Sequence, residues 1–142
     1  MQDKAEAAAE GPGDPQTDDE VSLDTADYSG AGAQVKFGTL NLEASVQRGI
    51  DALGFEHCSP IQGRILPHTL GGNDAIGKAQ TGTGKTAAFL VTIFNDLLSH
   101  PIEGERYLGE PRAVIIAPTR ELVMQIASDA KELGRFTGLK TV

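Results

Sequence analysis

An α/β fold, with a parallel sheet and a phosphate-binding loop, is what this sequence predicts. Short apolar segments alternate with segments of helix length from residue 37 onward, and a glycine-threonine loop stands between one apolar segment and the next helix. The run from Ala113 to Ala117 is apolar at every position, which is typical of a parallel strand covered on both faces. Strands that alternate with helices in this order indicate an α/β domain.

The first 36 residues have a different composition, and we expect them to form a disordered acidic tail. They carry nine acidic residues against two lysines, with few large apolar side chains and no periodicity. Such a segment cannot bury enough surface to offset the entropy lost on ordering. The tail is either a solvated spacer or a regulatory or partner-binding arm. Residues 37–142 carry eleven acids and ten bases, so the low isoelectric point comes from the tail and does not exclude an anionic partner for the folded part.

The cysteine count, the lengths of the apolar stretches and the spacing of the histidines exclude several classes of protein. A single cysteine, Cys58, cannot form an intrachain disulfide, which fits a reducing compartment. The sequence has no apolar stretch of signal-peptide length or membrane-span length. The three histidines and the cysteine lack metal-ligand spacing. We therefore expect a cytoplasmic protein with no membrane partner.

From residue 37 the elements can be placed in order. We expect a helix capped by Asn41 and ended by Gly54, a second helix begun by Ser59 and Pro60, a third over 85–99 and a fourth after Thr119. The expected strands are residues 74–78, 113–117 and 139–142. The sequence stops as the third strand begins, so residues 37–142 are expected to be the first part of a longer domain.

A phosphate-binding loop is predicted at residues 79–86. Its pattern is that of a P-loop in which alanine replaces the first glycine, and it comprises Ala79, Gln80, Thr81, Gly82, Thr83, Gly84, Lys85 and Thr86. The glycines let backbone N–H groups surround a phosphate at a helix N-terminus. Lys85 is expected to reach the β- and γ-phosphates, and the Thr86 hydroxyl to ligate Mg²⁺. The alternative is a glycine-rich turn followed by a threonine cap.

Three motifs in order resemble the DEAD-box RNA helicases. The loop at 79–86 resembles that family's form of the P-loop sequence, residues 54–62 resemble its Q motif, and residues 118–122 resemble its first RNA-contact motif. Phe37 stands at the family's spacing of seventeen residues before Gly54. Within the family, residues 60–62, 97–101 and 125–130 are most similar to the bacterial RhlB type. The resemblance covers residues 37–142 and implies part of the first RecA-like helicase domain.

The resemblance also assigns roles to residues outside the loop. Gln62 would recognise adenine, since a side-chain amide both donates and accepts hydrogen bonds, and Phe37 would stack on the base. Pro118, Thr119 and Arg120 would hold the RNA sugar-phosphate backbone. Each role has an alternative. Gln62 also completes a capping box with Ser59, Phe37 could be an apolar anchor, and Thr119 could be a helix cap.

The activity implied by the resemblance is ATP-dependent unwinding of short RNA duplexes, with ATP and Mg²⁺ as cofactors and an RNA-degradation assembly as a partner. Residues 1–142 contain no Asp-Glu-Ala-Asp motif, which in the family holds Mg²⁺ and activates water. We therefore expect these residues alone to be inactive. The alternatives are a catalytically inactive ATP-binding fragment and another P-loop enzyme, such as a kinase.

Overall fold

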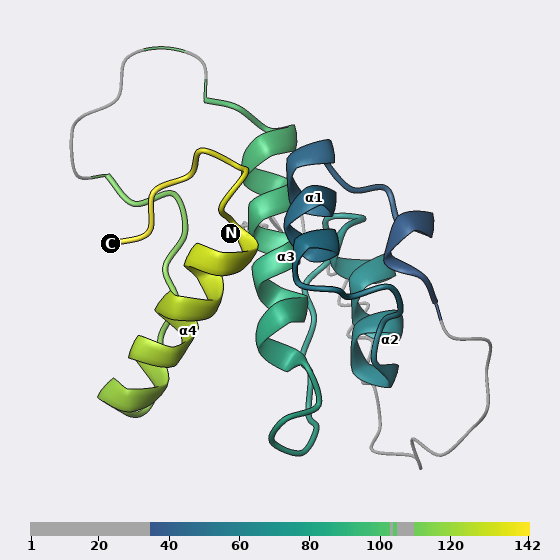
Figure 1. Ribbon diagram of the computed structural model, residues 1–142. Helices are drawn as coiled ribbons and strands as arrows, with labels where there is room; N and C mark the ends of the chain where they lie inside the picture. The colour runs from purple at the N-terminus through teal and green to yellow at the C-terminus, as the bar shows by residue number, and fades with distance from the viewer. Residues whose placement is uncertain (1–34, 103, 105–109) are drawn as a thin grey trace, which may run out of the picture.

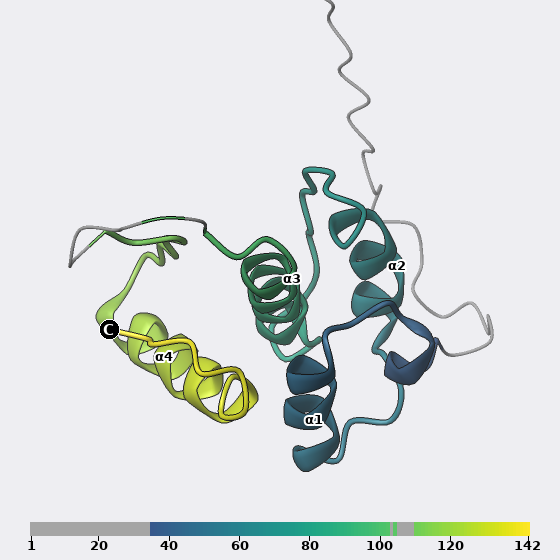
Figure 2. The same ribbon diagram turned by 90° about the horizontal axis from the view of Figure 1, so that it is seen from above.

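The computed structural model describes residues 35–102, 104 and 110–142. In these ranges α3 (Lys85–Ser99) lies at the centre and contacts α1 (Ala44–Ala52), α2 (Pro60–Thr69) and α4 (Arg120–Leu133). Figure 2 shows α2 and α4 on opposite sides of α3. All but the last two residues of the predicted tail lie outside the described residues, so the disorder of that segment stays a prediction.

The chain enters the folded part through η1 (Phe37–Thr39) and α1. The prediction of a cap at Asn41 is wrong, because α1 begins after Glu43. The reason lies on α3, where the Asn95 side-chain oxygen accepts a hydrogen bond of 2.7 Å from the Glu43 backbone amide. That contact fixes the chain two residues beyond Asn41. The end of the helix is as predicted, since Gly54 follows it with a φ of 73°.

α2 and α4 begin at the residues that the sequence indicates. Ser59 caps α2 with Pro60 in the first turn, and Thr119 caps α4, where its hydroxyl accepts a hydrogen bond of 3.3 Å from the Leu122 amide. Both caps satisfy backbone amides that have no partner inside the helix. α3 spans the predicted residues and is preceded by the glycine-threonine loop.

The core lies where α3 meets the other three helices. Its members are large apolar side chains that repeat at helical spacing and are nearly inaccessible to solvent: Phe37, Val46, Ile50, Leu66, Leu90, Val91, Phe94, Ile126 and Leu133. Burial of such side chains stabilises the fold by about 1.5–3 kcal/mol each. This packing fixes the N-terminal ends of α3 and α4 on one side of the molecule (Figure 1).

The predicted parallel sheet is absent from the described residues. Residues 74–78, 113–117 and 139–142 are present as connecting segments, and the one β-pairing is an isolated antiparallel bridge between Lys36 and His57. A strand requires a neighbour that completes its ladder of backbone hydrogen bonds. These segments do not pair with one another, and Ile76, Val114 and Ile116 are 71–89% exposed. Neither the predicted sheet nor the predicted cover on both faces of residues 113–117 is found among the described residues.

A close helix crossing joins the first and last parts of the described chain. A Cβ atom added at Gly49 of α1 would lie 2.0 Å from the carbonyl oxygen of Leu133, at the end of α4. Only glycine allows the two backbones to approach so closely. In the described ranges, no helix is both long enough and apolar enough to cross a membrane.

Candidate nucleotide-binding site

The loop before α3 turns through two glycines that have left-handed backbone conformations. Gly82 and Gly84 have φ values of 80° and 92°, which L-residues with side chains rarely adopt. Gly84 is the N-cap of α3, and Lys85 is its first residue. The free amides and the positive end of the helix dipole therefore face the loop, as anion binding at a helix N-terminus needs.

Residues of α2 hold this loop in place. The Gln62 side-chain amide donates a hydrogen bond of 3.0 Å to the Gly84 carbonyl, and the Ser59 hydroxyl donates one of 2.7 Å to the Thr83 carbonyl. A Cβ atom at Gly84 would lie 2.4 Å from the Gln62 amide nitrogen. Position 84 therefore needs glycine both for its φ angle and for this contact.

Gln62 also forms the capping box that the sequence left as an alternative. Its side-chain oxygen accepts a hydrogen bond of 2.7 Å from the Ser59 amide, while the Ser59 hydroxyl accepts one from the Gln62 amide. A glutamine amide carries two donor hydrogens and two acceptor lone pairs. One of each remains after the contacts to Ser59 and Gly84. Gln62 is only 6% exposed, so pairing with a base would require the amide to become accessible, and its role toward adenine stays a prediction.

Lys85 and Thr86 lie in the first turn of α3 and are half-buried. The Lys85 ammonium donates hydrogen bonds to the carbonyls of Ala79 and Gln80, so the loop curls around the positive charge. Phosphate oxygens are stronger partners for an ammonium than neutral carbonyls are. Lys85 therefore suits a phosphate group, and Thr86 places a hydroxyl beside it that could ligate Mg²⁺.

Phe37 lies in the core, not on an open face. Its residue is 1% exposed, and its backbone amide donates a hydrogen bond of 3.1 Å to the Glu56 carbonyl. In this structure Phe37 is the apolar anchor that the sequence left as an alternative. Stacking on a base would require its ring to become accessible.

The three residues with a predicted RNA role lie together at the N-terminal end of α4. Pro118, Thr119 and Arg120 are exposed, and Thr119 is also the helix cap. Figure 1 shows this end of α4 on the same side of the molecule as the loop before α3. The structure thus brings the predicted phosphate loop and RNA contacts to one side.

Ser59 is a site residue whose contact to the loop the sequence did not reveal. Its spacing before Gln62 indicated a helix cap, but nothing in the sequence indicated that its hydroxyl bonds Thr83, which lies 24 residues later.

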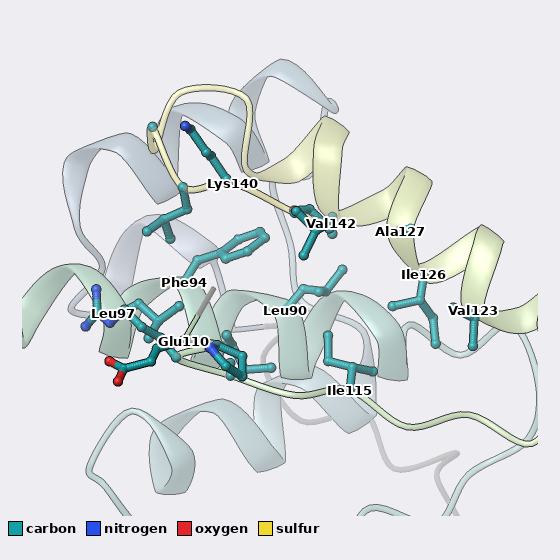
Figure 3. A pocket seen from close by; sticks show the side chains of 18 residues that line it. Leu90, Phe94, Leu97, Glu110, Ile115, Val123, Ile126, Ala127, Lys140 and Val142 are labelled. Carbon is teal, nitrogen blue, oxygen red and sulfur yellow. The ribbon is translucent and has the colours of Figure 1, made fainter. Parts of the chain in front are cut away.

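A hollow of about 700 Å³ lies away from the loop, between α3, α4 and the segments 110–113 and 138–142 (Figure 3). Its lining is mainly apolar, with Leu90, Phe94 and Ile115 among its members, and it does not include the loop.

The glycine loop, the lysine in the first turn of α3 and the docked glutamine define a protein of the P-loop class. Residues 59–142 match the family described as DEAD/DEAH box helicase. The chain belongs to that family. Among the described residues no three His, Cys, Asp or Glu side chains gather as a metal site would need.

Relatives and solved structures agree with this assignment. The chain is 57% identical over 109 residues to the ATP-dependent RNA helicase RhlB of Pseudomonas aeruginosa, which covers 77% of this chain and 28% of that protein. The RhlB of Serratia proteamaculans is 53% identical, with 74% and 24% covered. The chain thus spans about a quarter of the length of the curated relatives it matches.

Two solved structures share the fold. Yeast Dbp5, bound to Gle1 and IP6, superposes with a TM-score of 0.64 at 37% identity and covers 76% of this chain and 27% of that one. The RNA helicase Prp28 of Chaetomium thermophilum, bound to ADP, gives 0.60 at 37% identity, with 71% and 24% covered. The kinase alternative is therefore not favoured.

Proposed function

We propose that this chain is the ATP-binding front of an ATP-dependent RNA helicase whose whole protein separates short RNA duplexes. The observation that carries the proposal is the docking of Gln62 and Ser59 on the glycine loop. That contact joins a group able to recognise a base to a loop able to hold phosphates. The family and the helicases at 53–57% identity support the same activity.

In the proposed site, the residues of this chain bind and orient the nucleotide. Lys85 would exchange its bonds to the loop carbonyls for bonds to the β- and γ-phosphates. Gln62 would pair with adenine through its remaining donor and acceptor. Bound Mg²⁺ would supply charge neutralisation at the phosphates, with the Thr86 hydroxyl as one ligand. Phe37 would add stacking after its ring leaves the core.

RNA would be held by Pro118, Thr119 and Arg120. A hydroxyl, a guanidinium and a helix N-terminus suit contact with a sugar-phosphate backbone, which carries no sequence information. We also propose that the whole protein acts in the cytoplasm and in an RNA-degradation assembly. The resemblance to the RhlB type supports this part of the proposal.

RNA-stimulated phosphate release by the whole protein tests this proposal. Wild-type protein should hydrolyse ATP faster with single-stranded RNA, and Arg120→Ala should require more RNA for the same stimulation. The control is Arg112→Ala, because Arg112 donates to the His100 carbonyl outside the proposed site. Hydrolysis that RNA leaves unchanged, or an equal loss in both variants, would contradict the RNA role.

A further inference from the structure

Two arginines share one phenyl ring where α1 meets the C-terminal end of α4. The guanidinium carbon of Arg48 lies 4.5 Å from the centroid of the Phe136 ring, and that of Arg135 lies 4.7 Å from it. The close crossing at Gly49 brings Arg48 of α1 to this corner. Cation–π contact at these distances is favourable and restricts both side chains. We call these three residues the arginine–phenyl patch.

The positive charges of the patch are not neutralised by neighbouring carboxylates. Both arginines are exposed, and neither forms a salt bridge within the part of the chain that the structure describes. Asp51 and Glu132 lie within one helical turn of Arg48 and Arg135 in sequence, but neither carboxylate forms an ion pair with a guanidinium group among the described residues. Two guanidinium groups beside one ring repel each other, and an anionic partner would relieve that repulsion.

We propose that the arginine–phenyl patch binds the acidic segment of the same chain, residues 1–34. This segment carries nine carboxylates against one lysine. Carboxylates are the partners that guanidinium groups bind in two-point geometry. The patch is thus complementary in charge to the one strongly acidic segment of the chain.

The segment joins the folded part at Lys36, beside α1, the helix that carries Arg48. Lys36 lines a small hollow together with Gln47 and Asp51 of α1, and Arg48 is the next residue after Gln47. Asp27 precedes Lys36 by nine residues, and an extended chain spans about 3.3 Å per residue. Asp27 can therefore reach about 30 Å from Lys36. Such a tether corresponds to an effective concentration in the millimolar range.

An RNA strand fits the patch less well than the acidic segment does. The proposed RNA contacts lie at the other end of α4, and fourteen residues of helix separate the two ends by about 21 Å. Glu121 and Asp129 lie on that helix between Arg120 and the patch. A strand that runs from Arg120 to the patch would pass these negative charges. The C-terminal end of α4, which the patch adjoins, lies away from the loop before α3 (Figure 1).

A nitroxide on the acidic segment tests the proposal in the full chain. Thr25→Cys places the label between Asp24 and Asp27, while Cys58 stays buried and shielded from the reagent. The amide signals of Arg48 and Phe136 should lose at least half of their intensity at low salt, and should recover it in 0.5 M NaCl because salt screens the pairing. Arg48→Gln with Arg135→Gln should abolish the loss, whereas the matched control, Lys131→Gln with Lys140→Gln, should retain it. Thermal melts verify that each variant folds.

Three outcomes would overturn the proposal. One is the absence of broadening at Arg48 and Phe136. The second is broadening that the patch variant retains or that centres on Lys85 or Arg120. The third is a shift of the patch signals by a single-stranded RNA oligonucleotide without broadening from the label, which would assign the patch to RNA.

Discussion

Gln62 connects the helix cap and the nucleotide loop through one side chain. Its oxygen accepts from Ser59, and its nitrogen donates to Gly84. From the sequence, capping and base recognition looked like competing roles. The cap fixes the amide beside the loop and leaves it a donor and an acceptor, so both roles are possible once the buried amide becomes accessible. Substitutions must therefore be judged by base selectivity and not by stability alone.

Replacement of Gln62 by alanine should lower the preference for ATP over GTP. The amide that can pair with adenine is lost, and the capping interaction, worth about 1 kcal/mol, is lost with it. Ser59→Ala is the control, because it removes the cap and the bond to Thr83 but keeps the amide. Titration with both nucleotides should show a lower ATP-to-GTP affinity ratio in Gln62→Ala and an unchanged ratio in Ser59→Ala. An equal change of the ratio in both variants would mean that Gln62 acts through structure alone.

Cys58 should react slowly while the protein is folded. Its residue is 4% exposed, and burial raises the pKa of its thiol to about 11. Because the folded pKa exceeds that of an unfolded thiol, the folded state binds more protons between pH 9 and 11, so stability should fall as pH rises through that window. Urea melts at pH 8 and pH 10 check this trend. The trend should be weaker in Cys58→Ala, and rapid modification of native protein by iodoacetamide at pH 8 would contradict the burial.

At the scale of elements, the helices followed from the sequence and the sheet did not. Ser59, Pro60 and Thr119 are local signals, and each helix begins where its signal stands. A strand depends instead on a neighbour that can come from anywhere in the chain. The runs at 74–78 and 113–117 have strand-like composition, yet the described residues supply no ladder for them. The start of α1 was missed because Asn95, on another helix, determines it.

The crossing of α1 and α4 gives a prediction at this scale. Gly49→Ala should destabilise the fold by about 1–3 kcal/mol, because the added methyl group meets the Leu133 carbonyl and the helices must separate. Gly38→Ala is the matched control, since a Cβ atom there meets nothing within 4 Å. Urea unfolding followed by circular dichroism measures both. Equal stability of the two variants would show that α1 and α4 do not cross so closely in solution.

For the molecule as a whole, the arginine–phenyl patch and the nucleotide loop lie in different regions. The patch proposed for the acidic segment lies at the C-terminal end of α4, while the loop precedes α3. The sequence showed the contrast in charge between the two parts of the chain, but it could not place Arg48 beside Phe136, because that contact depends on the helix crossing.

Deletion of residues 1–34 should therefore leave ATP affinity within about twofold of that of the full chain. If residues 1–34 bind at the C-terminal end of α4, they make no fixed contact with the loop before α3. Fluorescence titration with a labelled ATP analogue, with and without the deletion, gives the comparison. A loss of tenfold or more would show that residues 1–34 help to form the nucleotide site.

ATP binding to the chain and to its Lys85→Ala variant tests the central claim most directly. Lys85 is the cation that the first turn of α3 places beside the loop, and a charge-assisted bond from it to the phosphates contributes about 1.5–3 kcal/mol. Calorimetric titration with ATP and Mg²⁺ should give an affinity at least about tenfold weaker in Lys85→Ala, with Lys140→Ala equal to wild type. If Lys85→Ala binds ATP as tightly as wild type does, the loop at residues 79–86 is not the phosphate site.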